Sequence, residues 1–359
     1  MVEWKKLGEV CEIGTGSNNR EDACDNGCYP FYVRSQEILK IDSYSYDEEA
    51  ILIPGEGGIG DIFHYINGKY GLHQRTYRVH PITDDVKGRY IYYFLFANFK
   101  TYINAKSYKS TAASIRKPML LDFPIIIPSL SEQTRIVGIL DTFTSAIDNL
   151  KEQIAQRRKQ YEYYRDQLLD LEGKPRVEMK KLGEIVVFRN GKGHEKIIIP
   201  DGKYIVVNSK FISSDGSVKK YCNEQISPLY VDDILMVMSD VPNGKAIAKC
   251  YLVERNNLYT LNQRIGAFHV CDSNVITKYL FYVINRNEQL LQYDNKIDQT
   301  NLKKDDILNI TIPLPPLQEQ QRIVSILDTF EASIQNLEAQ LKQREKQYEY
   351  YRNKLLTFE

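Results

Sequence analysis

The segment 86–121 is the most basic part of the chain, and it contains neither aspartate nor glutamate. Hydroxyl side chains are interspersed with its cations. Contacts to a phosphate backbone need cations together with hydroxyl or backbone donors, so this composition predicts binding to nucleic acid. A solvated surface is the plainer alternative. The residues concerned are Lys87, Arg89, Lys100, Lys106, Lys109, Arg116 and Lys117, with Tyr102, Tyr108, Ser110 and Thr111 among them.

Two Gln-Arg pairs, Gln74-Arg75 and Gln263-Arg264, occupy corresponding places in the two halves of the chain. Glutamine and arginine carry the groups that read the edges of adenine and guanine. Both pairs could equally brace the loops that contain them. The glycine-containing segments 55–60 and 241–245 also have two interpretations: tight turns, or loops whose amides approach a phosphate. The other candidate contacts in the second half are Lys192, Lys245, Gln299 and Thr300.

Enzyme motifs are missing from the sequence. It has no Gly-Lys-Ser/Thr phosphate loop. Pro315-Pro316-Leu317 lacks the amide or acid and the aromatic residue that surround the Pro-Pro pair of base methyltransferases. Cys24 and Cys28 have a spacing that metal sites use, but no second Cys or His pair at ligand spacing occurs in that half. We therefore expect no catalytic centre, no metal and free thiols.

The sequence contains a long internal repeat. Residues 4–10 reappear as residues 179–185, and residues 128–165 reappear as residues 315–352 with most positions identical. Between these blocks the halves diverge and share mainly a hydrophobic pattern. Repetition of this kind indicates two modules on one scaffold that differ in what they present.

The second repeated block has the seven-residue period of a coiled coil over about four heptads, and no proline interrupts it. Two such helices in one chain most simply pair with each other, and a breaker at residues 172–175 followed by a whole module favours an antiparallel pair. The first seam is Ile136, Leu140, Phe143, Ile147, Leu150, Ile154, Arg157, Tyr161, Tyr164 and Leu168, and the second is Ile323, Leu327, Phe330, Ile334, Leu337, Leu341, Arg344, Tyr348, Tyr351 and Leu355.

Polar and aromatic residues in the seams have alternative interpretations. Arg157 and Arg344 either pack their stems and extend their heads to solvent, or fix the register or meet a partner's carboxylates. The tyrosines of residues 161–164 and 348–351 cover more than one helix face. They contact either another subunit or the modules of this chain.

The variable halves have the pattern of an α+β fold, in which short strands such as 29–33, 50–53, 75–79, 204–207, 234–238 and 246–252 precede helices near 90–106 and 277–292. With 359 residues the chain is long enough for two or three domains. Its net charge is zero, so any binding of nucleic acid depends on local clusters of cations. Because no apolar stretch reaches the roughly 20 residues of a membrane helix and the start has no apolar signal core, we expect a cytoplasmic protein.

The residues resemble those of one family, the specificity subunits of Type I restriction–modification systems. The signature is a strand that ends in Pro128 or Pro315, followed by a Glu-Gln pair and a heptad helix. The pairs are Glu132-Gln133 and Glu319-Gln320, and the Lys-Leu-Gly-Glu openings of both modules match as well. The resemblance covers essentially the whole chain.

The resemblance implies an α+β fold with two globular target-recognition domains, each followed by a long helix, the helices pairing as an antiparallel coiled coil. The expected boundaries are 1–128 and 173–315 for the recognition domains and 129–172 and 316–359 for the helices. Each domain would read a few base pairs of double-stranded DNA, and the helices would set the spacer between two half-sites.

The resemblance also implies partners and cofactors. Two methyltransferase subunits would bind the helices and methylate adenine N6 with S-adenosylmethionine, and restriction subunits would add an ATP-dependent nuclease. The chain would hold no cofactor and perform no chemistry. A stand-alone DNA-binding regulator and a protein-binding scaffold remain the alternatives.

Overall fold

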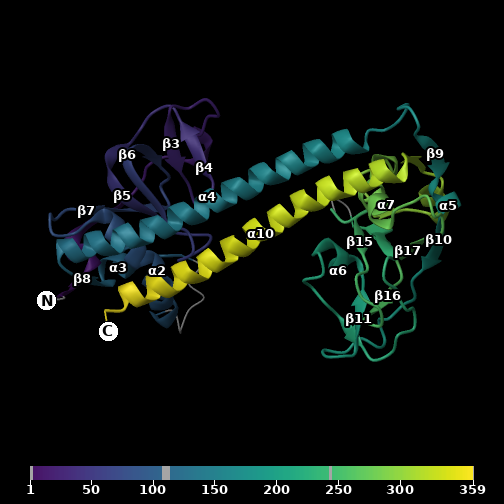
Figure 1. Ribbon diagram of the computed structural model, residues 1–359. Coiled ribbons are helices and arrows are strands. Elements are labelled where there is room, and N and C mark those ends of the chain that lie inside the picture. The colour runs from purple at the N-terminus through teal and green to yellow at the C-terminus, as the bar shows by residue number, and fades with distance from the viewer. Residues whose placement is uncertain (1–2, 107–113, 242–244, 359) are drawn as a thin grey trace. The chain divides into compact units, whose positions relative to one another are not determined.

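Two helices of 40 residues each, α4 (Leu130–Leu169) and α10 (Leu317–Leu356), run through the computed structural model (Figure 1). The structure describes residues 3–106, 114–241 and 245–358. The chain divides into unit 1, residues 1–154 and 337–359, and unit 2, residues 155–336. Each helix belongs to both units, because α4 passes from unit 1 into unit 2 and α10 passes back. No described helix is both long and apolar enough to cross a membrane.

The two long helices pair in antiparallel fashion, as the sequence predicts. In unit 1, near the start of α4, the ring of Phe143 stacks on Tyr351 near the end of α10, with centroids 5.3 Å apart. In unit 2, near the end of α4, Tyr164 stacks on Phe330 near the start of α10, with centroids 5.5 Å apart. Aromatic pairs of this geometry add to the stability that their burial provides.

The arginines in the seams stack on rings of the other helix. The guanidinium carbon of Arg157 lies 5.9 Å from the ring centroid of Phe330, and that of Arg344 lies 5.7 Å from Phe143. Cation–π attraction accounts for an arginine at these places in an otherwise apolar period. Each arginine therefore contributes to pairing of the helices in its own unit.

The tyrosines of the repeated block occupy equivalent positions in both copies. Tyr161 and Tyr348 pack against the cores of their units, as one interpretation of the sequence required. Tyr163 and Tyr350 remain 58% and 59% exposed. The block thus presents the same aromatic side chain to solvent twice.

Unit 1 is built on a six-stranded sheet in the order β2-β7-β5-β6-β3-β4, antiparallel except for β3 beside β6. A separate antiparallel pair joins β1 to β8. The strands are β1 (Glu3–Lys6), β2 (Cys11–Thr15), β3 (Tyr29–Tyr32), β4 (Ile38–Ile41), β5 (Tyr46–Pro54), β6 (His64–Leu72), β7 (Thr76–Pro81) and β8 (Pro124–Ile127). The short helices are α1 (Leu7–Val10), the 3-10 turn η1 (Arg20–Asp22) and α3 (Lys117–Leu121), and α2 (Gly88–Lys106) is longer.

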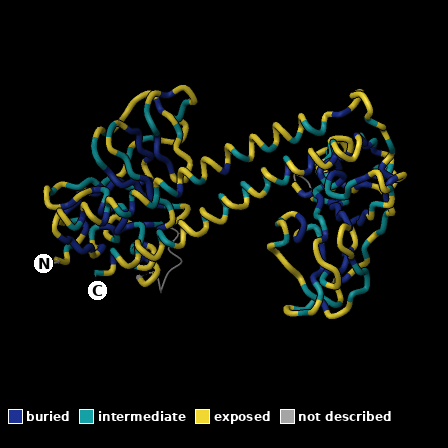
Figure 2. The backbone as a smooth tube through the Cα atoms, in the orientation of Figure 1, coloured by how far each residue is buried: buried dark blue, intermediate teal, exposed yellow. Residues whose placement is uncertain are grey.

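Buried residues gather in the sheet of unit 1 (Figure 2), and alternation along β5 divides them between two clusters. Ile51 and Ile53 belong to the larger cluster, which also includes side chains of α2, α4 and α10. Ala50 and Leu52 point to the opposite face and pack with tyrosines of β3 and β6. Successive side chains of a strand point to opposite faces, so both faces of this strand are buried.

Unit 2 repeats the plan with smaller sheets, in the orders β10-β17-β13-β15 and β12-β11-β16, and with the pairs β9–β19 and β14–β18. The strands are β9 (Glu178–Lys181), β10 (Val186–Asn190), β11 (Tyr204–Val207), β12 (Tyr221–Cys222), β13 (Ile234–Val237), β14 (Ser239–Asp240), β15 (Cys250–Leu252), β16 (Tyr259–Leu261), β17 (Ile265–Val270), β18 (Thr300–Asn301) and β19 (Thr311–Leu314). The helices are α5 (Leu182–Ile185), α6 (Ser209–Ser213), α7 (Thr277–Ile284), α8 (Glu288–Leu291) and α9 (Lys304–Leu308).

Two expected elements differ from the structure. The strand expected at residues 246–252 is confined to β15, and the helix expected at residues 277–292 is broken into α7 and α8. α7 ends where Asn285 becomes extended (φ −65°, ψ 109°), and Arg286 follows with φ +54°. The Asn287 side chain accepts a hydrogen bond from the Gln289 amide at 2.9 Å and so caps α8. The spacing of apolar residues continues across the break, so the sequence pattern does not predict it.

A buried glutamine ties each module to its long helix. Gln133, in the first turn of α4, is fully buried. Its Oε1 accepts a hydrogen bond from the Lys87 amide at 2.9 Å, and its Nε2 donates to the carbonyls of Asp85 at 2.8 Å and Pro128 at 2.9 Å. One side chain therefore joins the segment before α2, the end of β8 and the start of α4.

Gln320 makes the same three bonds in unit 2. Its Oε1 accepts from the Ile276 amide at 2.9 Å, and its Nε2 donates to the carbonyls of Asn274 at 2.8 Å and Pro315 at 2.9 Å. We call Gln133 and Gln320, each in its own unit, the glutamine anchor. The glutamine of each Glu-Gln pair is thus a buried connector.

A tyrosine–aspartate bond reinforces each glutamine anchor. The Tyr93 hydroxyl of α2 donates to Asp141 of α4 at 2.6 Å, and the Tyr282 hydroxyl of α7 donates to Asp328 of α10 at 2.6 Å. In unit 2 the Tyr282 hydroxyl also reaches Glu331 at 3.0 Å, and burial raises the pKa of Glu331. Hydrogen bonds to ionised carboxylates are among the stronger ones in proteins.

We predict that Gln320→Leu lowers the free energy of unfolding by about 3 kcal/mol, because it leaves one amide and two carbonyls of the anchor without partners. Urea unfolding of the full chain, followed by circular dichroism, measures the change. Gln318→Leu is the matched control, since Gln318 is exposed two residues earlier in the same helix. Equal stabilities of the two variants would contradict the role of the anchor.

Candidate nucleic-acid interface

In unit 2, separate segments meet beside the turn between β16 and β17. The turn carries Gln263 and Arg264, and both are exposed. The Gln263 amide donates to the Lys192 carbonyl at 3.0 Å, and the Met238 amide donates to the Arg264 carbonyl at 2.9 Å. These backbone bonds hold the segment after β10 and the end of β13 against the turn.

The segment around β18 joins the same place. The Leu302 amide donates to the Met238 carbonyl at 2.7 Å, and Gln299 Nε2 donates to Ser239 Oγ at 2.9 Å. Thr300 is paired with β14 and is buried. Gln299, Thr300 and Leu302 lie more than 30 positions after the turn in the sequence, and only the fold brings them to it.

Lys245 lies at the far end of the loop that follows β14. The Asp240 carboxylate shapes this loop by accepting from the Ala246 amide at 2.7 Å. Lys245 is exposed, and its carbonyl accepts a hydrogen bond from the Arg286 guanidinium. We call the predicted contacts of unit 2 together the unit 2 loop cluster: Lys192, Lys245, Gln263, Arg264, Gln299 and Thr300.

Unit 1 uses the same backbone frame. The Gly55 amide donates to the Arg75 carbonyl at 2.9 Å, as Met238 does to its arginine in unit 2. The Ile115 amide donates to the Gly55 carbonyl at 2.7 Å, and the Gln74 amide donates to the Asn18 carbonyl at 2.9 Å. Both modules therefore hold a Gln-Arg turn and the loop after a central strand in the same arrangement.

The glutamines of both turns brace neighbouring loops. Gln74 Nε2 donates to Asn19 Oδ1 at 2.6 Å. Gln263 Nε2 donates to Glu195 Oε1 at 2.9 Å. The bracing role that the sequence left open is thus present in both units, and in unit 1 the Arg75 side chain also bonds to the neighbouring loop through Glu56.

The surroundings of the cations differ between the two units: those of unit 1 have carboxylate partners, and Arg264 of unit 2 has an unusual backbone conformation. Arg75 is 56% exposed at its side chain and pairs with Glu56 at 2.9 Å, and Lys100 pairs with Asp61 in the same loop. Arg264 has φ +71°, in the left-handed region that non-glycine residues avoid. Strain of this kind is often kept where a side chain is held in place for function.

The remaining predicted contacts of unit 1 are at the end of α2 and beyond it. α2 ends at Lys106. Lys109, Ser110 and Thr111 lie outside the described residues, as does the side chain of Lys106. Their participation in the interface stays a prediction.

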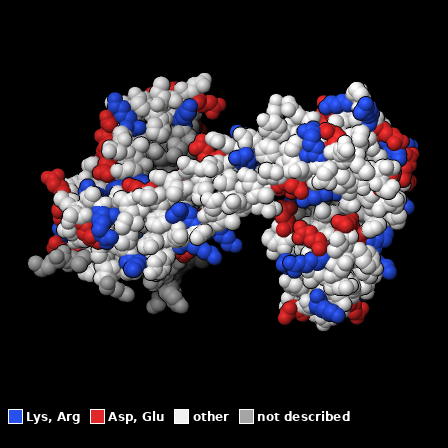
Figure 3. All heavy atoms as spheres, in the orientation of Figure 1, with Lys and Arg blue, Asp and Glu red and all other residues white. Residues whose placement is uncertain are grey.

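Acids from elsewhere in the fold balance part of the basic segment. Arg89 Nε lies 2.8 Å from Asp141, and Lys100 pairs with Asp61. On the face drawn in Figure 3, cations and carboxylates are interspersed and do not gather in one patch. The sequence argument counted acids within the segment only, and the fold supplies them from α4 and from the loop after β5.

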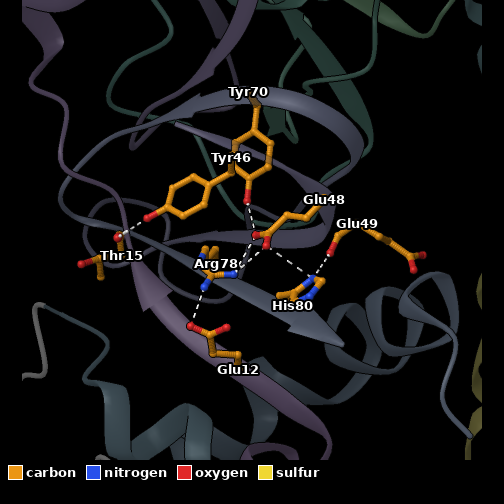
Figure 4. Close-up of polar contacts among 8 residues, drawn as sticks. All are labelled: Glu12, Thr15, Tyr46, Glu48, Glu49, Tyr70, Arg78 and His80. Atoms are coloured by element: carbon orange, nitrogen blue, oxygen red, sulfur yellow. Dashed lines mark hydrogen bonds and ion pairs between the residues drawn. The ribbon is translucent and has the colours of Figure 1, made fainter. Parts of the chain in front are cut away.

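A charge network centred on the buried Arg78 lies on the sheet of unit 1 (Figure 4). Arg78 on β7 is 9% exposed at its side chain and pairs with Glu48 at 2.7 Å and Glu12 at 2.6 Å. The Tyr70 hydroxyl donates to Glu48 at 2.9 Å, and the Arg78 guanidinium lies 4.8 Å from the ring centroid of Tyr46. The network connects β2, β5, β6 and β7 and stiffens the strands that carry the turn.

Sequence reasoning missed several residues of these loops. Arg34, Glu56 and Asp240 each organise a loop through side-chain bonds, yet none lies in a repeated motif. The anchors could have been found, since Gln133 and Asp141 recur in both copies of the long block. Their recurrence at the same positions of the repeated block was the available signal.

Comparison with known proteins gives a consistent result along the chain. The family model described as the Type I restriction modification DNA specificity domain matches residues 1–157 and 175–345. A Haemophilus influenzae protein, named provisionally as a type I restriction enzyme specificity subunit, is 27% identical over 99% of this chain and 96% of its own length. The EcoR124I/EcoR124II specificity subunit of Escherichia coli is 31% identical over 64% of this chain and 60% of its own length.

Solved structures share the fold. The crystal structure of a Type I restriction–modification S subunit from M. genitalium has a TM-score of 0.68 at 16% identity, covering 99% of this chain and 96% of that one. A chain from a study of complex assembly and conformational transition of the type I system has a TM-score of 0.60 at 15% identity, covering 99% and 97%.

Replacement of Arg78 by methionine is predicted to lower the free energy of unfolding by about 3 kcal/mol, because it removes the buried guanidinium that pairs with the Glu48 carboxylate, which is only 16% exposed. Arg135→Met is the matched control, since it removes an exposed ion pair of 2.6 Å with Glu132, and such pairs contribute less than about 1 kcal/mol. Urea unfolding of both variants makes the comparison. A similar small loss in both would show that the network does not stabilise the sheet.

Proposed function

Because this chain belongs to the family of Type I restriction–modification DNA-specificity subunits, we propose that it recognises double-stranded DNA in two parts, one for each unit. The observation that carries the proposal is the repeated loop frame. In both units a Gln-Arg turn is hydrogen-bonded to the residue after a central strand, Gly55 or Met238, at 2.9 Å. DNA readers place side chains on loops that a rigid scaffold positions.

The side chains on the shared frame differ, so the two parts of the target would differ in sequence. Predicted contacts of unit 1 are Gln74, Arg75, Lys100, Lys106, Lys109, Ser110 and Thr111, and those of unit 2 are the unit 2 loop cluster. Arginine and lysine supply phosphate contacts and guanine contacts, and the hydroxyls of Ser110 and Thr111 would supply donors to phosphate. The Thr300 hydroxyl is buried and donates to Asp294 at 3.1 Å, so it does not supply such a donor. The long helices α4 and α10 would set the unspecified spacer between the parts.

The exposed residues of the repeated block support two copies of one partner. Pairing of the helices does not require identical residues on their solvent face, yet Tyr163 and Tyr350 recur at 58% and 59% exposure, and Leu130 and Leu317 recur at 44% and 43%. Exposed aromatic and aliphatic side chains are typical of protein interfaces. We therefore assign the two equivalent surfaces to two methyltransferase subunits.

In this proposal the chain contributes specificity and no chemistry. The methyltransferase subunits would bind S-adenosylmethionine and methylate adenine N6, and restriction subunits, where present, would bind ATP. The chain itself would hold no cofactor. The absence of methyltransferase and phosphate-loop motifs from its sequence supports this division.

Methylation mapping of whole genomes tests the proposal. We expect cells that express this chain with the methyltransferase subunit of its system to methylate a split motif, two short defined parts around unspecified bases. Cells with the methyltransferase alone should lack that motif. Chain-independent methylation, with both proteins expressed, would contradict a specificity role and favour a regulator or a scaffold.

We predict that the double variant Tyr163→Ala, Tyr350→Ala weakens association with the methyltransferase subunit at least about tenfold, as loss of aromatic anchors does at other interfaces. Titration calorimetry with the purified subunit measures the affinity. Tyr44→Ala is the control, because Tyr44 is 44% exposed and lies outside the repeated block. Equal affinities of the control and the double variant would exclude this surface as the interface.

A further inference from the structure

Three loops of unit 1 bring two arginines to one carboxylate. Arg34 lies between β3 and β4, Glu56 follows β5, and Arg75 is in the turn between β6 and β7. Arg34 Nη1 and Arg75 Nη1 lie 3.0 Å and 2.9 Å from the same oxygen, Glu56 Oε2. The three side chains are 43%, 37% and 56% exposed, so their other polar atoms can reach a ligand.

The backbone around the three residues fixes the cluster. Besides the Gly55–Arg75 bond, the Arg75 amide donates to His73 Nδ1 at 3.0 Å. His73 is buried, and burial lowers its pKa. Because His73 Nδ1 accepts the bond from Arg75, the ring proton is on Nε2. A hollow of about 260 Å³ opens beside the cluster and is lined by Arg20, Val33, Arg34, Ser35, Glu56, Gly57 and His73.

The polar atoms left over in the cluster match a base pair better than a phosphate. Hydrogen bonds among the described residues reach only Oε2 of Glu56 and only Nη1 of each arginine. Free guanidinium donors and a free carboxylate oxygen therefore stand side by side. A phosphate would be attracted by the arginines and repelled by Glu56. Recognition of the major-groove edge of a G·C pair needs both guanidinium donors and a carboxylate acceptor, since guanine presents two acceptors and cytosine presents an amino donor.

We propose that Arg34, Glu56 and Arg75 read one G·C base pair in the part of the target that unit 1 recognises, an inference that rests on the proposed function. Arg75 donates to guanine O6 and N7, and Glu56 Oε1 accepts from the cytosine N4 amino group. Arg34 is a positioning residue that holds Glu56 from the opposite side. The lowered pKa of Glu56, caused first by its hydrogen bond from Arg75, keeps the carboxylate ionised as an acceptor.

Unit 2 has no equivalent cluster among its described residues. Ser239 occupies the place of Glu56, since it follows Met238 as Glu56 follows Gly55, and its hydroxyl accepts from Gln299. The position that corresponds to Glu56 therefore carries a hydroxyl in place of a carboxylate. Changes to the cluster of unit 1 should alter one part of the target and leave the other part unchanged.

The test is Glu56→Gln in the full chain, expressed with its methyltransferase and mapped by methylation. The amide keeps the size of the side chain but removes the charge that selects cytosine's amino group. We expect discrimination at one G·C position in one part of the motif to fall at least about tenfold. The second part and the spacer length should stay as in the unchanged chain.

Arg75→Lys provides a second test if Glu56→Gln does not fold. Lysine keeps the positive charge but lacks the forked donors of arginine, so the same base-pair position should lose its selectivity. Asp122→Asn is the control, because it removes an exposed carboxylate paired with Lys6 at 2.9 Å and should leave the motif unchanged.

The outcomes separate the inference from the function on which it rests. An unchanged motif in both folded variants would show that the cluster only braces the loops. Equal weakening at every methylated sequence would show a phosphate contact, and would also overturn the inference. Absence of a split motif with the unchanged chain would overturn the proposed function itself, and the inference with it.

Discussion

The side-chain amide of a buried glutamine is the constraint on which the rest of this structure depends. Gln133 and Gln320 each satisfy one amide and two carbonyls at the point where a module meets a long helix. Leaving such groups unpaired in the interior is costly, so the geometry at each junction is narrowly defined. The Tyr93–Asp141 and Tyr282–Asp328 bonds add a second point of attachment, which prevents the module from pivoting about the first.

A fixed junction leaves the loops free to differ. The Gln-Arg turns keep their backbone bonds in both units, but their neighbours change from Glu56 to Ser239 and from Asn19 to Glu195. Backbone hydrogen bonds do not depend on side-chain identity, so the frame tolerates substitutions that alter what is read. This separates the part of the chain that must stay constant from the part that determines a sequence preference.

The long helices and most strands could be predicted from the sequence, because heptad spacing and alternation are local. The chemistry of the loops could not. The bonds of Gln133 reach residues 46 and 48 positions away, and Arg34 and Arg75 meet Glu56 only after three loops have converged. The net charge around the basic segment 86–121 was misjudged for the same reason, since Asp141, which pairs with Arg89, lies outside that segment. Asn285 and Arg286 broke a helix whose apolar spacing continued unchanged.

Unit 1 is assembled from both ends of the chain, whereas unit 2 is the continuous stretch 155–336. Leu356 is buried in the core of unit 1 together with Ile136 and Leu140. Chains emerge from the ribosome with the N-terminus first and fold as they emerge. Unit 2 is therefore synthesised in full while unit 1 still lacks the end of α10, which carries Leu356 into its core. The first module to be synthesised is the last to be finished.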